Sequence, residues 1–387
     1  MLSEVPEGWS LQRFGDIASV KNGFAFKSKD FVDSQSGVAA VVRMSDLKNG
    51  TVEASSAKKI PLDCLEGLER FKLKAGDFVF GMSGSLNNYA VVPASSFPLY
   101  LNQRVGKLEA KGADAAFLRF LYTSEGFMRL VAKSASGNAQ LNISGKQIES
   151  FEIPVPPFNE QQRIAEILSS VDASIQATQA VIEQAERVKR GLMEELLTGG
   201  LGSEAIERGE VPEGWQVNQL GEVCSPKQHP TIAKTKFTSD GYPVYGANGQ
   251  IGFYSDYTHS ERAIAITCRG ATCGTINIVP PKSYITGNAM ALDSLNESVV
   301  TFGFLNHYLR HFGVDACITG SAQPQITRSS LLPLKLVVPP QNEQRRIAEI
   351  LSASDEFIAA QNSVVEQQSR TKRGLMDDLL TGKVRTV

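Results

Sequence analysis

The sequence predicts an α+β protein: two mixed α/β domains separated by a long antiparallel two-helix coiled-coil spacer, with pseudo-two-fold symmetry. Two observations lead to this prediction. Residues 156–169 (PPFNEQQRIAEILS) return at 339–352 as PPQNEQRRIAEILS, at an offset of 183. Residues 5–9 (VPEGW) return at 211–215, at an offset of 206. Repeated segments in the same order indicate internal duplication. The stretch enclosed between the VPEGW segment and the Pro-Pro block is 23 residues longer in the first copy than in the second, because the two offsets differ by that number.

Each long repeated block predicts one helix. Paired prolines precede each block and are excluded from a helix interior, so Asn159 and Asn342 are expected at the N-caps. Both blocks end in a Thr-Gly pair, at residues 198–199 and 381–382, where glycine commonly terminates a helix. Between these limits apolar residues recur about every seven positions, densely at the ends and sparsely in the middle, as in a coiled-coil seam. About 39 residues per helix predict a rod of roughly 60 Å.

Two arrangements of these helices are compatible with the pattern. Each helix can pack on the surface of its own domain, or the two can pair with each other in an antiparallel fashion. In a pair, the polar side chains of Gln361 and Gln368 would help to fix the register. The pair would also place the two enclosed domains at opposite ends of one rod, which is the geometry of a molecular ruler.

The enclosed stretches predict mixed α/β domains, because short β-branched runs alternate with glycine- and asparagine-rich turns. A helix is expected near the end of each stretch, at 115–131 and 301–312. The clearest strand-like runs are 38–43, 77–80, 90–92, 263–267 and 275–279. The predicted parts are a first domain at 1–155, a first spacer helix at 156–200, a linker at 201–210, a second domain at 211–338, and a second spacer helix with a C-terminal tail at 339–387.

The composition predicts an ordinary soluble protein, with 42% hydrophobic and 21% charged residues. The sequence contains no apolar run long enough to span a membrane, and its first residues lack the pattern of a signal peptide. Five cysteines, an odd number, favour reduced thiols over a disulfide framework. We therefore expect a cytoplasmic protein.

The net charge of −2 conceals local differences. Residues 1–155 carry 18 basic and 16 acidic groups, and residues 211–338 carry 9 and 8, so both enclosed stretches are slightly basic. Residues 157–210 carry 5 basic and 10 acidic groups, whereas the last 49 residues are neutral. This distribution permits nucleic-acid binding by local patches. It also predicts that tight binding needs a basic partner protein.

Motifs for catalysis are missing, so we expect a non-catalytic chain. There is no phosphate-binding Gly-x4-Gly-Lys-Ser/Thr loop and no Asn/Asp-Pro-Pro-Tyr/Phe sequence of an amino-methyltransferase. His307 and His311 share one face of a predicted helix, but no glutamate follows His307, so an ordinary surface helix is expected rather than a metal site. Cys268 and Cys273 are expected to be ordinary buried thiols. We predict no metal site.

With these motifs in place, the whole chain resembles the specificity subunit of type I restriction-modification systems. The order of domain, Pro-Pro-x-x-Glu-Gln-x-Arg-Ile-Ala helix, second domain and repeated helix is highly specific to that family. A second repeat, Gly-x-Ala-Gln-x-x-Ile, lies just before each helix. The remaining matching segments are 5–9 (VPEGW), 23–28 (GFAFKS), 43–47 (RMSDL), 137–143 (GNAQLNI), 242–249 (YPVYGANG) and 320–326 (GSAQPQI).

The resemblance implies a DNA-reading subunit without catalytic activity of its own. Each enclosed domain would be a target-recognition domain that reads one half of a bipartite double-stranded DNA site. The paired helices would separate these domains and dock two modification (methyltransferase) subunits, which restriction (ATP-dependent translocase and nuclease) subunits join. No cofactor is expected in this chain, because S-adenosylmethionine, ATP and Mg would reside on the partner subunits.

Candidate DNA-binding residues are Arg, Lys, Asn, Gln and Ser side chains on irregular segments, where they can bond to base edges or phosphates. Gln140 and Gln323 occur in both repeats, which suits a structural or phosphate-positioning role better than base discrimination. Candidates in the first domain are Lys21, Arg43, Ser45, Lys48, Arg104, Gln140 and Asn142. Candidates in the second domain are Lys227, Lys234, Lys236, Asn248, Arg269, Lys282, Gln323, Gln325 and Arg328.

The repeated helix ends supply the candidate partner-binding residues, because two equal faces can dock two identical subunits. These are Gln161, Arg163, Ile164, Glu194, Leu197, Gln344, Arg346, Ile347, Asp377 and Leu380. A scaffold that binds proteins rather than DNA through the same two domains remains an alternative function. A self-sufficient nuclease or methyltransferase is disfavoured by the missing motifs.

Overall fold

The computed structural model describes residues 5–32, 37–48, 50–135, 141–247, 249–320 and 323–386. The chain forms two compact units. Unit 1 comprises Met1–Ala177 and Val365–Val387, and unit 2 comprises Thr178–Val364. Among the described residues, none of the helices is both long and apolar enough to cross a lipid bilayer.

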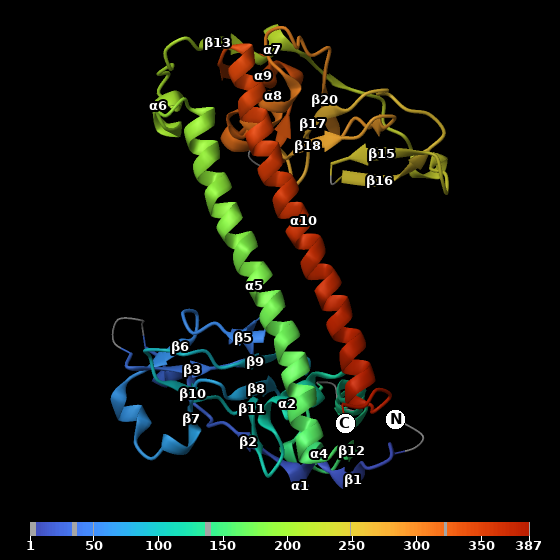
Figure 1. Ribbon diagram of the computed structural model, residues 1–387. Helices are drawn as coiled ribbons and strands as arrows, with labels where there is room; N and C mark the ends of the chain where they lie inside the picture. The colour runs from blue at the N-terminus through green and yellow to red at the C-terminus, as the bar shows by residue number, and fades with distance from the viewer. Residues whose placement is uncertain are drawn as a thin grey trace. The chain divides into compact units, whose positions relative to one another are not determined.

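Unit 1 contains a six-stranded sheet, a four-stranded sheet and a two-stranded antiparallel pair (Figure 1). The six-stranded sheet has the order β2-β11-β8-β9-β5-β4: Ala18–Asn22, Val105–Ala110, Phe78–Gly81, Tyr89–Val91, Gly50–Val52 and Leu47–Lys48. The four-stranded sheet has the order β6-β3-β10-β7: Lys58–Ile60, Ala39–Val42, Leu99–Leu101 and Lys72–Leu73. In the remaining pair, β1 (Ser10–Arg13) joins β12 (Glu152–Val155), so the two ends of the first domain meet.

Four short helices accompany these sheets: α1 (Phe14–Ile17), α2 (Ala115–Thr123), α3 (Glu125–Ala135) and α4 (Gly145–Glu149). The helical stretch predicted at 115–131 is confirmed, but it is divided into two helices. The chain breaks at Ser124, whose hydroxyl donates to Leu121 O at 2.7 Å and accepts from Phe127 N at 3.2 Å. A serine hydroxyl that bonds the main chain in this way ends one helix and caps the next.

Unit 2 has a related but smaller set of sheets. A four-stranded sheet has the order β14-β20-β17-β18: Ser225–Gln228, Ala289–Asp293, Ala263–Thr267 and Ile276–Val279. A three-stranded sheet has the order β16-β15-β19: Gly249–Tyr254, Tyr242–Gly246 and Tyr284–Ile285. Two-stranded pairs join β13 (Gln216–Gln219) to β23 (Lys335–Val338) and β21 (Ile318–Thr319) to β22 (Gln325–Ile326). The five predicted strands of the two domains are confirmed to within one residue at each end.

The short helices of unit 2 are α6 (Ser203–Glu207), α7 (Leu220–Val223), α8 (Phe302–Phe312) and α9 (Arg328–Leu331). Helix α6 lies inside the segment predicted to be a linker. Helix α8 matches the predicted 301–312 helix, with Thr301 at its N-cap. It is not an ordinary surface helix, however, because His307 is only 2% exposed and its Nε2 lies 3.2 Å from Ser352 Oγ. Cys268 is buried as expected, whereas Cys273 is half-buried.

The two predicted long helices are confirmed as α5 (Phe158–Leu197) and α10 (Gln341–Leu380), each of 40 residues. Both begin one residue before the predicted N-caps, so Asn159 and Asn342 lie inside the first turn. The division between the two units falls within both helices. Each unit therefore contains one end of α5 and the opposite end of α10.

Equivalent helix residues fill the core of each unit. In unit 1, Ile164 and Leu168 of α5 pack with Leu380 of α10 in one apolar cluster. In unit 2, Leu197 of α5 packs with Ile347 and Leu351 of α10. Each residue of the first set lies 183 positions from a residue of the second, so the duplication in sequence is also a duplication of internal packing.

A buried glutamine fastens each long helix to its own unit. Gln161 Oε1 accepts from Asp114 N at 3.0 Å, and its Nε2 donates to Pro156 O at 2.9 Å. At the equivalent place in unit 2, Gln344 accepts from Thr301 N at 2.7 Å and donates to Pro339 O at 2.9 Å. Asp114 and Thr301 are the N-cap residues of α2 and α8, so each glutamine connects a long helix to a domain helix.

Charged pairs follow the same repeat. In unit 1, Lys372 Nζ lies 2.6 Å from Asp172 Oδ1, and in unit 2 Lys189 pairs with Asp355. The two aspartates are 183 residues apart, as are the two lysines. Within each unit, one salt bridge therefore joins α5 to α10 at an equivalent place.

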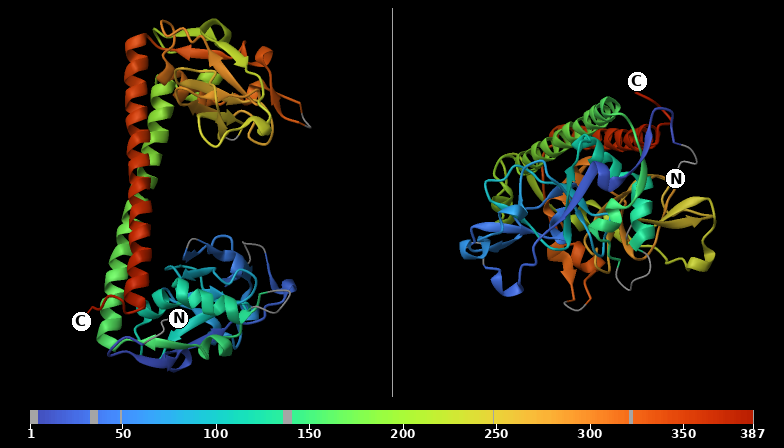
Figure 2. Two further views of the ribbon diagram at one scale, coloured as in Figure 1. Left: turned by 90° about the vertical axis from the view of Figure 1, so that its right-hand side faces the viewer. Right: turned by 90° about the horizontal axis from the view of Figure 1, so that it is seen from below.

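The described part of the C-terminal tail belongs to unit 1, as the red end of the chain shows in Figure 2. Arg385 donates from Nε and Nη2 to the two carboxylate oxygens of Glu160, at 2.7 and 2.8 Å. Trp9 Nε1 also donates to Glu160, at 3.1 Å. The hydrogen bonds from Arg385 hold the pKa of Glu160 below its usual value, against the opposing effect of burial. This contact contributes stability above the ordinary glutamate pKa, and the contribution is lost as the pH falls through the lowered value.

Replacement of the buried glutamine tests the fastening of α5. We expect Gln161→Ala to lower the free energy of unfolding by about 1–3 kcal/mol, because it leaves the main chain at Asp114 and Pro156 without its partners. Urea denaturation of the full chain measures this loss. The neighbouring exposed Gln162→Ala is the control and should change stability by less than about 0.5 kcal/mol. Equal effects of the two substitutions would contradict the assigned role.

Candidate nucleic-acid interface

In unit 1, three distant segments meet through main-chain hydrogen bonds around Met82. Met82 N donates to Arg104 O at 3.0 Å, and Met82 O accepts from Ile143 N at 3.0 Å. The next residue, Ser83, forms an isolated antiparallel bridge with Asn142. We call residues 82–84, 102–104 and 141–143 the unit 1 junction. It brings together two predicted DNA-binding residues, Arg104 and Asn142, both of which are exposed.

Unit 2 contains the same arrangement around Cys268. Cys268 N donates to Asn288 O at 3.0 Å, and Cys268 O accepts from Ile326 N at 2.9 Å. Arg269 then forms an isolated antiparallel bridge with Gln325. We call residues 268–270, 286–288 and 324–326 the unit 2 junction. It brings together the predicted residues Arg269 and Gln325, which are also exposed.

The two junctions share a backbone but differ in side chains. Ser83 in unit 1 corresponds to Arg269 in unit 2, Arg104 corresponds to Asn288, and Asn142 corresponds to Gln325. Guanidinium and amide groups present different donors and acceptors, which suit different base edges. The junctions therefore combine one common framework with two different chemical surfaces.

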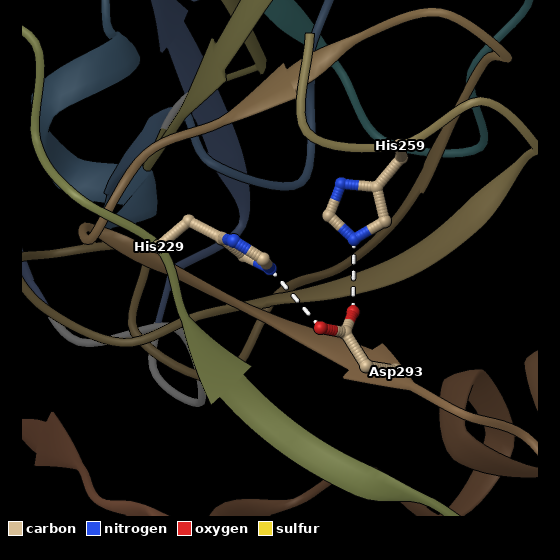
Figure 3. A group of neighbouring side chains, drawn as sticks. All are labelled: His229, His259 and Asp293. Carbon is tan, nitrogen blue, oxygen red and sulfur yellow. Dashed lines mark hydrogen bonds and ion pairs between the residues drawn. The ribbon is translucent and has the colours of Figure 1, made fainter.

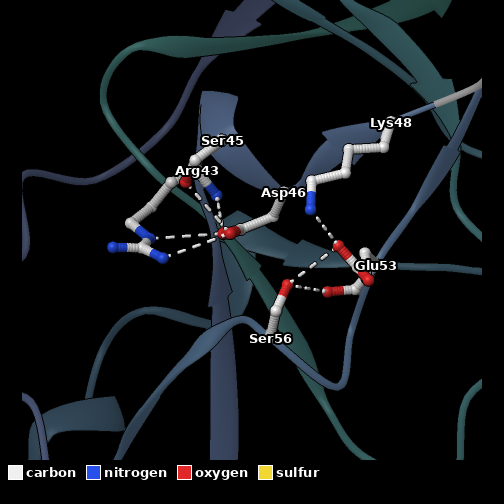
Figure 4. Close-up of polar contacts among 6 residues, drawn as sticks. All are labelled: Arg43, Ser45, Asp46, Lys48, Glu53 and Ser56. Carbon is white, nitrogen blue, oxygen red and sulfur yellow. Dashed lines mark hydrogen bonds and ion pairs between the residues drawn. The ribbon is translucent and has the colours of Figure 1, made fainter. Parts of the chain in front are cut away.

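The segment after β3 lies beside the unit 1 junction, because Ser83 Oγ lies 3.3 Å from Met44 Sδ. Figure 4 shows how this segment is held. Asp46, 2% exposed, accepts from Arg43 N at 2.9 Å, Arg43 Nε at 3.2 Å and Arg43 Nη2 at 3.1 Å. Ser45 Oγ donates to the same carboxylate at 3.0 Å. The predicted residues Arg43 and Ser45 thus stabilise a turn through Asp46.

Lys48 follows this turn and is exposed. Its Nζ lies 2.6 Å from Glu53 Oε2, and Ser56 Oγ donates to Glu53 at 3.3 Å (Figure 4). The hydrogen bond with Glu53 raises the pKa of Lys48, and the same bond lowers the pKa of Glu53. Lys48 is therefore a solvent-exposed cation whose partner is the exposed carboxylate of Glu53.

The other predicted DNA-binding residues lie on separate segments. Lys21 in β2 is 3.8 Å from Glu109, and Lys227 lies in β14, where it pairs with Ala291. Arg328 in α9 donates to Ser225 Oγ at 3.4 Å. Lys234 and Lys236 are exposed at the two ends of a short 3-10 helix (Lys234–Lys236), and Lys282 and Gln323 are exposed at bends. Gln140 and Asn248 lie outside the described residues.

The predicted partner surface requires a correction. Six of its ten residues are buried inside their own units, where they pack or bond internally and offer no side-chain surface to a partner. They are Gln161, Ile164, Leu197, Gln344, Ile347 and Leu380. The exposed candidates are Arg163, which donates to Thr386 O at 2.6 Å, Glu194, Arg346 and Asp377. Their contact with a partner stays a prediction.

Sequence reasoning missed Ser83 and Asn288 as members of the junctions. The available signal was the weak similarity between 100–104 and 284–288, together with that between 84–85 and 270–271. These matches have offsets of 184 and 186 rather than 183, so small insertions hide the correspondence from the main repeat.

Comparison with known proteins adds independent information. A family model described as "Type I restriction modification DNA specificity domain" matches residues 6–187 and 212–367. The chain is 27% identical over 414 residues to the putative type I restriction enzyme MjaX specificity subunit of Methanocaldococcus jannaschii, with coverage of 99% of this chain and 95% of the relative. It is 24% identical to the MjaVIII specificity subunit of the same organism, covering 98% of this chain and 94% of the relative.

Solved structures resemble the fold. The S subunit of a type I restriction-modification system from M. genitalium aligns with a TM-score of 0.64 at 17% identity, covering 98% of this chain and 97% of that one. A chain from a structure titled for complex assembly and conformational transition of the type I R-M system aligns with a TM-score of 0.54 at 20% identity, covering 98% and 100%. At these identities the likeness concerns the fold alone.

Proposed function

Because the chain belongs to the type I restriction-modification DNA specificity family, we propose that its two domains read the two halves of one bipartite DNA site. The chain is a specificity subunit, and its task is the choice of DNA sequence. Each domain would contact double-stranded DNA with the segments around its own junction. Catalysis is assigned to partner subunits.

The observation that carries this proposal is the pair of junctions. Main-chain hydrogen bonds build both, so the surrounding side chains can differ without loss of the fold. Arg269 can donate two hydrogen bonds to guanine, whereas Asn142 and Gln325 have the amide geometry that pairs with adenine. Exposed lysines such as Lys48 would hold phosphates and set the orientation of each domain.

Helices α5 and α10 would form an antiparallel spacer with pseudo-two-fold symmetry. Two salt bridges between α5 and α10 support this arrangement, Asp172–Lys372 in unit 1 and Lys189–Asp355 in unit 2. Asp172 precedes Lys189 along α5, whereas the partner of Asp172 follows the partner of Lys189 along α10, as expected for antiparallel helices. The equivalent glutamines fasten opposite helix ends to equivalent domain helices. The length of the pair would set the number of unread base pairs between the half-sites.

Two modification subunits would dock on the exposed helix surface, and restriction subunits would join that core. The exposed candidates Arg163, Glu194, Arg346 and Asp377 supply charged groups for such contacts. Residues 157–210 carry more acidic than basic groups, which would favour binding to a basic surface on a partner subunit. S-adenosylmethionine, ATP and Mg would be bound by those partners.

Sequencing of methylated bases in the source cell tests the function as a whole. We expect a split adenine-methylation motif with an undefined central gap, because two separate domains read it. Deletion of the chain should abolish methylation at that motif, and re-expression should restore it. Persistence of the marks after deletion, or failure of the complex with its methyltransferase to bind duplex DNA, would favour a protein-binding scaffold instead.

Replacement of Arg269 tests the unit 2 junction. We expect Arg269→Ala to reduce discrimination within one half-site by roughly 5- to 150-fold, the value of a lost bidentate base contact. The assembled methyltransferase complex would be assayed on DNA with single-base changes in each half-site. Arg310→Ala, which removes another exposed cation of unit 2 on α8, is the control and should leave discrimination intact. Altered discrimination in both half-sites, or in neither, would contradict the assignment.

Lengthening of the spacer tests the ruler. Insertion of four residues into both helices, near the boundary between the units, adds about one turn and about 6 Å to each. We expect the gap in the methylated motif to grow by roughly one to two base pairs while both half-site sequences stay the same. A matched insertion of four residues in the 208–211 turn, outside both helices, should leave the gap unchanged. A new half-site sequence after lengthening would rule out a simple spacer.

A further inference from the structure

Two histidines and one aspartate converge in unit 2, as Figure 3 shows. Asp293 Oδ2 lies 3.1 Å from His229 Nε2, and Asp293 Oδ1 lies 2.8 Å from His259 Nε2. The side chains are 12%, 13% and 21% exposed for His229, His259 and Asp293. They come from the end of β14, from the loop before β17 and from the end of β20, so the cluster joins three separate segments.

Burial and the charges within the cluster act on its ionisable groups. Burial lowers the pKa of His229, against the opposing charge and hydrogen bond of Asp293. Burial also opposes ionisation of Asp293, but the hydrogen bond and charge of His259, with those of His229, hold the pKa of this carboxyl below its usual value. A neutral imidazole and an ionised carboxylate are the forms that bind metal ions.

A neighbouring hydroxyl can orient His259 as a ligand. Thr258 Oγ1 lies 2.7 Å from His259 Nδ1, 3.3 Å from Ser283 O and 2.9 Å from Ile285 N, which donates to it. If the hydroxyl donates to Ser283 O, it accepts a hydrogen bond from Nδ1–H, and the Nε2 lone pair is then directed at the cluster. Metal-binding histidines commonly have such an outer partner on the second ring nitrogen.

We propose that His229 Nε2, His259 Nε2 and Asp293 form a binding site for a divalent transition-metal ion of the Zn²⁺ class. All three donor atoms lie within 4.8 Å of one another. Metal–ligand bonds of about 2.0–2.2 Å place the donor atoms of a tetrahedral site roughly 3.3 Å apart, so the three donor atoms need to move only slightly closer to one another. Two imidazoles and one carboxylate match the ligand preference of zinc.

An adjacent cavity provides space for a fourth ligand. It has a volume of about 440 Å³, and its lining includes Thr258, His259, Asp293 and Glu297. A water molecule in this cavity could complete a tetrahedral set, as occurs when a protein supplies three ligands. Among the described parts of the chain, this is the single group of three or more potential ligands at metal-binding spacing.

The metal ion would act as a structural cross-link. It would tie the end of β20 to the segment that begins at His229 and carries Lys234 and Lys236, two predicted DNA-binding residues. Gln228 already donates to Gly287 O at 2.8 Å, and Tyr284 donates to Pro230 O at 3.0 Å, so this segment is anchored on both sides of His229. The inference concerns unit 2 alone and does not depend on the proposed DNA specificity.

Metal titration of the full-length chain tests the site. After treatment with a chelator and its removal, we expect one equivalent of Zn²⁺ to bind by calorimetry and to raise the thermal unfolding temperature. Co²⁺ should give a visible absorption band of tetrahedral nitrogen and oxygen ligation. Uptake should fall as the pH is lowered, since protons compete with the metal ion for imidazole nitrogen.

Three substitutions locate the binding. His229→Gln, His259→Gln and Asp293→Asn should each weaken Zn²⁺ binding at least tenfold and abolish the thermal shift. His311→Gln, which changes a histidine bonded to Glu194 and Ser203 outside the cluster, is the control and should bind like the wild type. Circular dichroism without metal checks that the variants fold. If one variant does not fold, the variants that do fold and the Co²⁺ spectrum of the wild type decide whether the site exists.

Three results would overturn the proposal. The first is no stoichiometric uptake by the wild-type chain. The second is equal uptake by the wild type and the folded ligand variants. The third is a sulfur charge-transfer band with Co²⁺, which would assign the ion to cysteines instead.

Discussion

The main-chain pairing around Met82 in unit 1 and Cys268 in unit 2 is the constraint on which both domains depend. Main-chain donors and acceptors in such places must be paired, and here they are paired with one another across three segments. Because no side chain is needed for this pairing, the neighbouring positions are free to differ. Serine, arginine and asparagine in the unit 1 junction therefore correspond to arginine, asparagine and glutamine in the unit 2 junction, without a change of fold.

The long helices were predictable because their signals are local: a Pro-Pro pair before each, a Thr-Gly pair after each and a seven-residue period between. The burial of their end residues inside each unit was not predictable in this way. Gln161 and Ile164 were predicted to meet a partner because they repeat at Gln344 and Ile347, but the repetition reflects the same internal contact made twice. A repeated residue near a helix end can serve packing as well as docking, and only the tertiary contacts distinguish the two.

The candidate DNA-binding residues were chosen by residue type, and nothing in the sequence indicated how the fold groups them. Arg, Lys, Asn and Gln were selected because they suit nucleic acids, yet the junctions unite a subset: Arg104 with Asn142, and Arg269 with Gln325. The partners are tens of residues apart, and no periodicity connects them. A similar separation in sequence hid the cluster of His229, His259 and Asp293, where the aspartate lies 64 and 34 residues from the two histidines. The histidines that sequence proximity suggested, His307 and His311, bond to different partners instead.

A chain with a net charge of −2 can still bind a polyanion if some of its cationic side chains can leave their carboxylate partners at low cost. Lys48 and Lys21 are paired with exposed carboxylates, and exposed ion pairs contribute little, so a phosphate can replace the carboxylate at low cost. Arg43 is different, because its partner Asp46 is buried and would lose its charged partner if the guanidinium moved away, keeping only the hydrogen bonds from Arg43 N and Ser45 Oγ. The lysines are therefore suited to exchange partners on DNA, whereas Arg43 holds the turn in place. Local exchange of this kind, rather than overall charge, would let the first domain bind DNA.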